Sequence, residues 1–354
     1  MKRDQYVGMD VHQATTVVAV VDAEGKLVLE TIVATEAAAI RRLIESLSGP
    51  LHVTLEETTQ AQWLSEVMRD RVAELVVCDP KRNKLLRAGS KGDKKDAREL
   101  AELIRTGRVR SVYHGHEKTQ KLKELVRAYQ MFSVDTKRTM LRIKAVYRGR
   151  GIRTSGTGVY QAKQRSYWLE QLTEPGLRQR VEWLYAELDH VRQLRKEAKA
   201  AVLAEGCRHR AVGLLRTIPQ LGPLRAAEIV AIGGTPYRFR TKRQFWSYSG
   251  LAVVTHSSAE YELQAGRVVR RNKPIATRGL NRNCNRQLKF LFVSAATAGG
   301  VNHPYRDYLQ SLHQRGIRPE MARLTLARKI ATLALTLWKR GETFDPKKLN
   351  WMTT

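Results

Sequence analysis

Two carboxylates lie three residues apart in the basic stretch SKGDKKDARELAELIR, residues 90–105. Residues i and i+3 share one face of a helix, so Asp93 and Asp96 can both point at one cation. They can equally serve the start of the helix, because an Asp at the N-cap and another in the first turn satisfy free N–H groups and suit the helix dipole. This stretch alone leaves both interpretations open.

Two further acids sit in segments that read as strands. Asp10 lies in the apolar strand YVGMDV, where a bare buried charge would be very costly without a partner or a metal. Alternation puts Asp10 on the less apolar side of that strand, and Glu56 in LHVTLEE matches it better than Glu57, the fallback. Four converging acids repel one another unless cations neutralise them, and two oxygen-bound divalent ions serve phosphodiester chemistry. The order Asp, Glu, then Asp-x-x-Asp therefore predicts a metal site built from Asp10, Glu56, Asp93 and Asp96.

The charge balance predicts a polyanionic partner. The 354 residues include 63 Lys plus Arg against 34 Asp plus Glu, a net charge of +29. Nucleic acid is the first expectation and an anionic membrane surface the rival. Around the acids, the backbone of a nucleic acid is expected to contact Lys91, Lys94, Lys95 and Arg98. No transmembrane run or signal peptide is evident, and three scattered cysteines fit a reducing cytoplasm rather than a disulfide framework.

Residues 1–115 are expected to form an α/β domain. Three strands, the second and third joined by a short turn at AEGK, are followed by alternating helices and strands, which predicts a mixed sheet. This is the element order of the ribonuclease H-like fold. In such a sheet the first and fourth strands are neighbours, so Asp10 and Glu56 would face each other. The helix that begins at Asp93 would close the site.

Residues 116–208 are expected to form basic helices and a coiled-coil hairpin. Helical apolar spacing runs through residues 117–150, and the near absence of acids after residue 127 favours a phosphate-tracking face over a merely solvated one. The basic residues taken to bind nucleic acid there are Arg138, Arg142 and Lys144. In a second long helix, around residues 177–198, the apolar residues alternate between spacings of four and three positions. That pattern suits a coiled-coil hairpin or a dimer seam.

Residues 209–354 are expected to be mostly helical. LLRTIPQLGPLRAAEIVAIGG reads as helix, tight turn and helix, like a helix-hairpin-helix that meets a phosphate, although a plain αα-corner looks much the same. VVTHSSAEYELQAGRVVRRNKP reads as a polar, turn-like loop beside the strand-like GLAVV. A Ser-Ser pair in such a loop is usually turn chemistry. Here arginines would surround an attacked phosphate and stabilise its charge, namely Arg267, Arg270 and Arg271.

The chain resembles the DEDD transposases of bacterial insertion sequences, the bridge-RNA-guided serine recombinases. GMDVHQ, LEETT and GDKKDARELAELIR are similar to the family's RuvC-like half, and FWSYSGLAVVTHSSAEY and RNKPIATRGLNRNCNRQL to its transposase domain. The resemblance implies a tetrad with Mg²⁺ and a catalytic serine, which spacing from Gly250-Leu251 places at Ser258. The chain departs from the pattern in LEETTQ, where members often carry a small residue and a Gly after the Glu, so Glu56 and Glu57 stay open as ligands.

The same resemblance implies donor and target DNA as substrates, a non-coding bridge RNA, and a dimer or tetramer whose tetrad and serine come from different protomers. It also implies a cytoplasmic, nucleoid-associated protein. Two alternatives remain. A structure-specific nuclease of the Holliday-junction-resolvase type would use the tetrad with water and would not need Ser258. A nucleic-acid-binding protein with a decayed domain would need neither, and the intact acidic set argues against it.

Overall fold

The computed structural model describes residues 3–80, 92–112, 119–258, 261–264, 267–270, 275–299 and 305–346, apart from the side chains of residues 256–258, 262 and 275–278. The chain divides into two compact units, Met1–His114 and Gly115–Thr354. The further boundary expected near residue 208 stays a prediction. Within the described part, none of the helices has the length and apolar character needed to span a bilayer.

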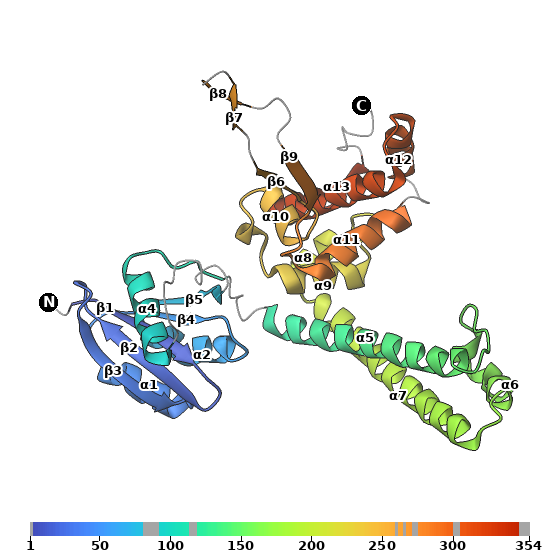
Figure 1. Cartoon of the computed structure of the whole chain (residues 1–354), viewed down its shortest axis with the longest axis horizontal. Helices are drawn as coiled ribbons and strands as arrows, with labels where there is room; N and C mark the ends of the chain where they lie inside the picture. Colours follow the sequence, from blue (N-terminus) through green and yellow to red (C-terminus); the bar gives the residue numbers. More distant parts are fainter. Residues whose placement is uncertain are drawn as a thin grey trace. The chain divides into compact units, whose positions relative to one another are not determined.

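The first unit is built on a five-stranded mixed sheet in the order β3-β2-β1-β4-β5 (Figure 1). β1 runs antiparallel to β2 and parallel to β4, β3 is antiparallel to β2, and β5 is parallel to β4. The mixed sheet, the hairpin and the pairing of the first and fourth strands are confirmed. The strands are β1 Gln5–Val11, β2 Thr15–Val21, β3 Leu27–Ala34, β4 Leu51–Glu56 and β5 Glu74–Cys78.

Different helices cover the two faces of this sheet. Val7 and Met9 of β1 belong to a core that also contains buried residues of α1 (Ala37–Ser46) and α2 (Ala61–Met68), which the short 3-10 helix η1 (Arg69–Arg71) follows. On the other face, Ala97 of α4 (Asp93–Arg105) packs on Val17 and Ala19 of β2. Gly8 and Asp10 lie on this second face, as alternation along β1 predicts.

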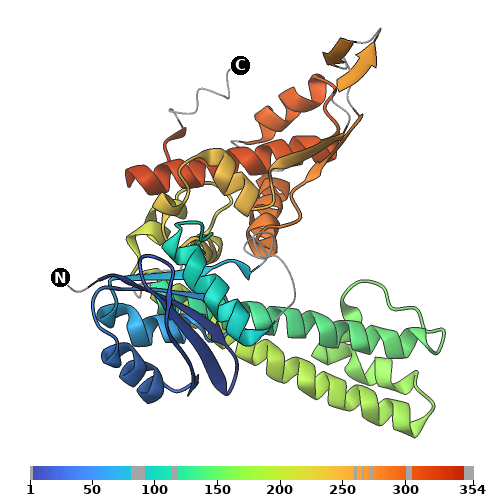
Figure 2. The ribbon, with the colours of Figure 1, turned by 60° about the vertical axis from the view of Figure 1, so that its left-hand side comes forward.

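Two long antiparallel helices open the second unit, as the heptad-like spacing indicates. They are α5 (Gln120–Arg148) and α7 (Pro175–Gly206), joined through η3 (Gly158–Tyr160), η4 (Ala162–Gln164) and α6 (Arg165–Glu170). Figure 2 shows them running side by side. Cross-helix contacts set the direction, since Lys121 pairs with Glu205 at 3.0 Å near one end and Thr139 donates to Glu187 at 3.0 Å further along.

The remainder of the second unit is mostly helical, as expected. One large core joins residues from α5 and α7 to those of the C-terminal helices. The predicted helix–turn–helix is confirmed as α8 and α9, with Gly222 preceding α9 and Gln220 at a φ of 69° in the turn. The elements are α8 Arg210–Leu215, α9 Pro223–Gly233, η5 Pro236–Arg238, α10 Lys242–Tyr248, α11 Arg286–Gly299, α12 Tyr305–Gln314 and α13 Pro319–Arg340.

The stretch expected to be a polar loop is instead strand-forming, and that prediction is wrong. β6 (Val253–Ser258) pairs antiparallel with β9 (Ile275–Leu280), and β7 (Tyr261–Gln264) pairs with β8 (Arg267–Arg270). Every β8 side chain is exposed. β7 and β8 have only four residues each, the shortest length over which alternation indicates a strand, so in the sequence they are hard to tell from a loop.

Candidate active site

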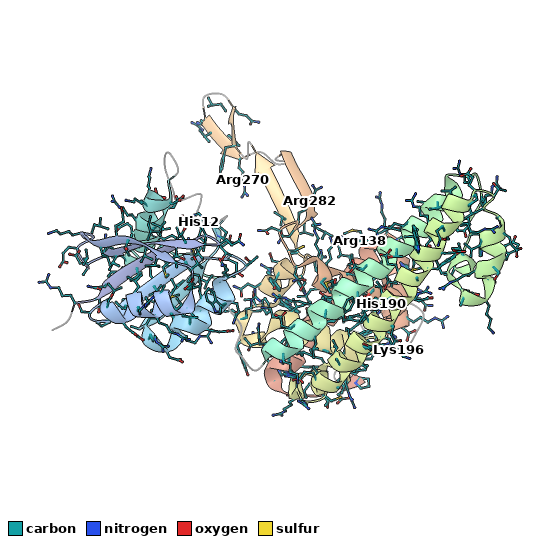
Figure 3. The ribbon with its side chains drawn as sticks, turned by 90° about the horizontal axis from the view of Figure 1, so that it is seen from below. His12, Arg138, His190, Lys196, Arg270 and Arg282 are labelled. Atoms are coloured by element: carbon teal, nitrogen blue, oxygen red, sulfur yellow. The ribbon has the colours of Figure 1, made fainter. Side chains whose placement is uncertain are left out.

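Three ligand-type side chains meet where β1 ends and α4 begins. His12 Nε2 lies 3.3 Å from Asp10 Oδ2 and 3.6 Å from Asp93 Oδ2. One ligand atom from each of these residues lies within 4.8 Å of the others, the only such group of three or more in the described part of the chain. Asp10 comes from β1, His12 follows that strand, and Asp93 opens α4. Figure 3 labels His12 in the first unit.

Gly8 allows α4 to approach the strand this closely. A Cβ on Gly8 would lie 2.0 Å from the Ala97 carbonyl oxygen and 2.4 Å from the Ala101 backbone nitrogen. No side chain fits at such distances, so the helix backbone rests directly on β1. Because Asp10 is two residues along the same face, this contact puts the first turn of α4 over Asp10.

The expectation of an aspartate at the N-cap is wrong, whereas the expectation of an aspartate in the first turn is confirmed. The N-cap of α4 is Gly92, and no side chain caps the helix with a hydrogen bond. Asp93 and Asp96 both lie in the first turn, where their negative charge still suits the helix dipole. N-capping therefore does not account for these two aspartates.

The surroundings of Asp10 disfavour the charged form of its carboxyl. Partial burial raises the pKa of the Asp10 carboxyl, and the negative charges of Asp96 and Asp93 raise it further, while nearby His12 works in the opposite direction. The negative charges of both first-turn acids of α4 therefore act on the Asp10 carboxyl. A cation bound between these carboxylates would remove the repulsion.

Glu56 is the last residue of β4, next to β1 in the sheet. The parallel ladder aligns Met9 with Leu55, so the next residues, Asp10 and Glu56, both turn to the face that α4 covers. Glu57 lies beyond the strand, where its backbone N–H donates to the Cys78 carbonyl at 2.9 Å. The choice of Glu56 over Glu57 as a metal ligand stays a prediction that this register favours.

The donor set fits a hard divalent cation. Carboxylate oxygens are the preferred ligands of Mg²⁺ and Mn²⁺, and two of the three side chains in this group are carboxylates. Sequence reasoning missed His12, although a signal was present. His12 stands two residues after Asp10, the spacing that keeps two side chains on one side of an extended chain.

The basic residues around α4 already have partners within the first unit. Glu30 of β3 binds Lys94 at 3.1 Å and Arg98 at 2.5 Å, and these cations lower the pKa of its carboxyl by hydrogen bonding. Lys95 lies 3.9 Å from Glu99. The ion pairs of Lys94 and Arg98 therefore hold α4 against the edge strand β3. Contact of these basic residues with nucleic acid stays a prediction. Lys91 lies outside the described residues.

The basic residues of α5 are also partly matched. Arg138 lies 3.4 Å from Asp135, Arg142 lies 3.1 Å from Glu187, and Lys144 donates to the Gly156 carbonyl at 2.9 Å. Figure 3 places Arg138 along α5. Both arginine side chains are more than half exposed, so they can still reach a phosphate. Their nucleic-acid role stays a prediction.

Ser258 is the last residue of β6, opposite Ile275 of β9. Its side chain lies outside the described part of the chain, so its role as nucleophile stays a prediction. Of the arginines expected around it, Arg267 and Arg270 are exposed on β8, and Figure 3 shows Arg270 on that ribbon. Arg271 lies outside the described residues.

Known families match both units. Residues 7–149 match a model described as a transposase, DEDD_Tnp_IS110, and residues 212–310 match one described as the transposase IS116/IS110/IS902 family. Over these two stretches the chain is similar to transposases of the IS110/IS116 family. A stretch of 134 residues is also 28% identical to the insertion element IS116 uncharacterized 44.8 kDa protein of Streptomyces clavuligerus. That alignment covers 38% of the chain and only 30% of the relative's length.

The two matched regions contain different sets of the predicted functional residues. The first runs from β1 to the end of α5 and contains all four acids of the predicted tetrad. The second begins in α8, ends in α12 and contains Ser258 with both paired ribbons. These matches support an insertion-sequence transposase in general terms, and the chemistry of each domain is a further question.

Proposed function

We propose that this chain is the recombinase of an insertion sequence, which excises the element and inserts it by serine-mediated DNA strand exchange. The observation that carries the proposal is the convergence of Asp10, His12 and Asp93 at the start of α4, in a region that matches DEDD transposases. The strand order of the first unit supports a ribonuclease H-like, RuvC-like fold. The paired helices α5 and α7 support a coiled-coil middle segment.

The proposed chemistry is transesterification. The Ser258 Oγ attacks a DNA phosphodiester, so an oxygen–phosphorus bond to serine forms while the bond to the leaving sugar oxygen breaks and that oxygen takes up a proton. A new DNA hydroxyl then attacks the phosphoserine and releases the serine. The number of phosphoester bonds is unchanged, so the exchange needs no nucleotide hydrolysis.

The tetrad residues form the second part of the proposal. Asp10, Glu56, Asp93 and Asp96 would hold Mg²⁺, which when bound would polarise a phosphate and stabilise the charge of a leaving oxygen. His12 contacts two of these carboxylates and would fix their orientation. Arg267 and Arg270 would stabilise the charge that develops on the attacked phosphate.

The proposed partners follow from charge and family. A net charge of +29 suits donor and target DNA together with a guide, the bridge RNA that the resemblance implies. The same resemblance leads us to propose a dimer or tetramer in the bacterial cytoplasm, associated with the nucleoid. Sequencing RNA that copurifies with the protein tests the bridge RNA. Measuring the mass of the protein in solution tests the dimer or tetramer.

Metal binding tests the tetrad without relying on recombination. Titration of Mn²⁺, followed by electron paramagnetic resonance, should show binding to the wild type and its loss in Asp96→Ala. Glu56→Gln and Glu57→Gln form a matched pair, and only the first should weaken binding. Equal binding by Asp96→Ala and the wild type would contradict the tetrad, and the reverse order in the pair would move the ligand to Glu57.

Strand exchange tests the chemistry. Recombination should stop in Asp10→Ala and Asp93→Ala, and also when a chelator removes Mg²⁺. A resolvase-like nuclease would share this dependence, because it uses the same acids with water as nucleophile. It would instead give free nicked ends, and Ser258→Ala would still cut.

A further inference from the structure

The ribbon formed by β7 and β8 carries apolar side chains that nothing covers in the described part of the chain. Leu263 is 75% exposed, Val268 71% and Tyr261 60%. Among the described elements, the two strands pack chiefly on each other, and Figures 1 and 2 show them projecting from the helices of the second unit. An isolated two-stranded ribbon is only marginally stable in water, so a surface of this kind implies an occupant.

The strand register sorts these side chains onto one face. Leu263 is opposite Val268, and Tyr261 is opposite Arg270. Residues directly opposite point to the same side, and alternate residues along each strand share it. One face therefore presents Tyr261, Leu263, Val268 and Arg270. Arg267, opposite Gln264, belongs to the other face.

The chain tethers this ribbon to the proposed nucleophile, and here the inference rests on the proposed function. Ser258 ends β6 and Tyr261 begins β7. Three residues of extended chain span at most about 11 Å. DNA whose phosphate lies at Ser258 must therefore pass close to the start of the ribbon.

We propose that the β7–β8 ribbon lies in the major groove of the DNA beside the cleaved phosphate, with its apolar face toward the base edges. The major groove, about 12 Å wide, admits a two-stranded ribbon, and its thymine methyl groups accept apolar side chains while guanine accepts arginine. Leu263 and Val268 supply the first contact and Arg270 the second. Four residues per strand span about 13 Å, close to four base pairs.

Charge decides between DNA and a second copy of the chain as the occupant. The ribbon carries Arg267 and Arg270, and the sequence continues with Arg271 and Lys273. A second copy of the ribbon would bring its own arginines against these, whereas DNA brings the opposite charge. The apolar face then adds contacts that depend on the bases rather than on the phosphates.

Chemical footprinting tests the proposal on the full chain. The variant is Leu263→Ser combined with Val268→Ser, and the matched control is Val28→Ser, which removes an exposed valine from β3 of the first unit. Dimethyl sulfate reports on guanine N7, which lies in the major groove. The DNA substrates carry guanines at the four base pairs on either side of the cleaved phosphate.

The wild type and the control should protect guanine N7 next to the cleaved phosphate. The ribbon variant should lose that protection and bind the DNA about tenfold more weakly, with an unchanged salt dependence because every bond to a phosphate is kept. Its melting temperature should stay that of the wild type, since the altered side chains are largely exposed.

Three results would overturn the proposal. Protection of adenine N3 instead of guanine N7 would place the ribbon in the minor groove. Unchanged protection in the ribbon variant, with loss of self-association in sedimentation, would make the face a protein contact. Unchanged protection and unchanged association would leave it without a role. A covalent DNA–protein product is scored separately, so its absence would refute the serine chemistry while the footprints still judge the ribbon.

Discussion

Substituting Gly8 with alanine should disable the candidate metal site without touching an acid. The new methyl group would lie 2.0 Å from the Ala97 carbonyl oxygen and 2.4 Å from the Ala101 nitrogen, both in the helix backbone. A carbon needs at least about 3 Å from such atoms, so α4 must move by about 1 Å. Overpacking of this kind costs about 1–3 kcal/mol of folding free energy.

The variant should lose function even when it still folds. Asp93 and Asp96 move with α4, whereas Asp10 stays on β1, so the carboxylates separate by about the displacement of the helix. A misplacement of about 1 Å in a catalytic group reduces the rate by about a hundredfold. The assays are thermal unfolding, Mn²⁺ binding and strand exchange on the same preparation of Gly8→Ala.

A matched control lies at the start of the same helix. Gly92 precedes Asp93, and a Cβ there would meet nothing within 4 Å. Gly92→Ser also supplies a preferred N-cap residue, so it should keep or raise the melting temperature. Wild-type stability and metal binding in Gly8→Ala would refute the argument that the contact between β1 and α4 builds the site.

Two other predictions concern charge. Burial raises the pKa of Glu228 despite hydrogen bonds from Gln130 and Gln287, so its contribution to stability is present below its usual value of 4.5 and is lost as pH rises through the raised pKa. Glu228→Gln should therefore flatten the fall in melting temperature above pH 4.5, and an unchanged profile would contradict this. Changing Arg138, Arg142 and Lys144 together to Gln should reduce the slope of log affinity against log salt by about 0.9 for each phosphate that the protein no longer neutralises, and an identical slope would mean that this face is only solvated.

Sequence patterns were sufficient for the sheet and the long helices, because periodicity reports directly on which side of an element is buried. Gly8 and Asp10 share the face that alternation assigns to them, and α4 begins at Asp93 as expected. α13 begins at Pro319 and ends before Gly341, two residue types that often mark the start and the end of a helix. Such features depend on local spacing alone.

Features that depend on distant neighbours were beyond the sequence. The pairing of Lys94 and Arg98 with Glu30 joins residues more than sixty positions apart, so in the sequence these cations look like free nucleic-acid ligands. His12 was missed because one histidine beside an acid carries little information until the start of α4 is placed near it. The β7–β8 ribbon resembles a loop in sequence because each of its strands has only four residues.

The formation of a covalent bond between Ser258 and DNA is the most direct test of the proposed function. The protein is incubated with donor DNA, its copurified RNA and Mg²⁺, then denatured, digested and analysed by mass spectrometry. The account predicts a phosphoserine-linked nucleotide at Ser258, absent in Ser258→Ala and retained in Ser257→Ala, while both variants bind DNA like the wild type. Free nicked ends without an adduct, or cutting that persists in Ser258→Ala, would contradict the serine mechanism and leave a metal-dependent nuclease in its place.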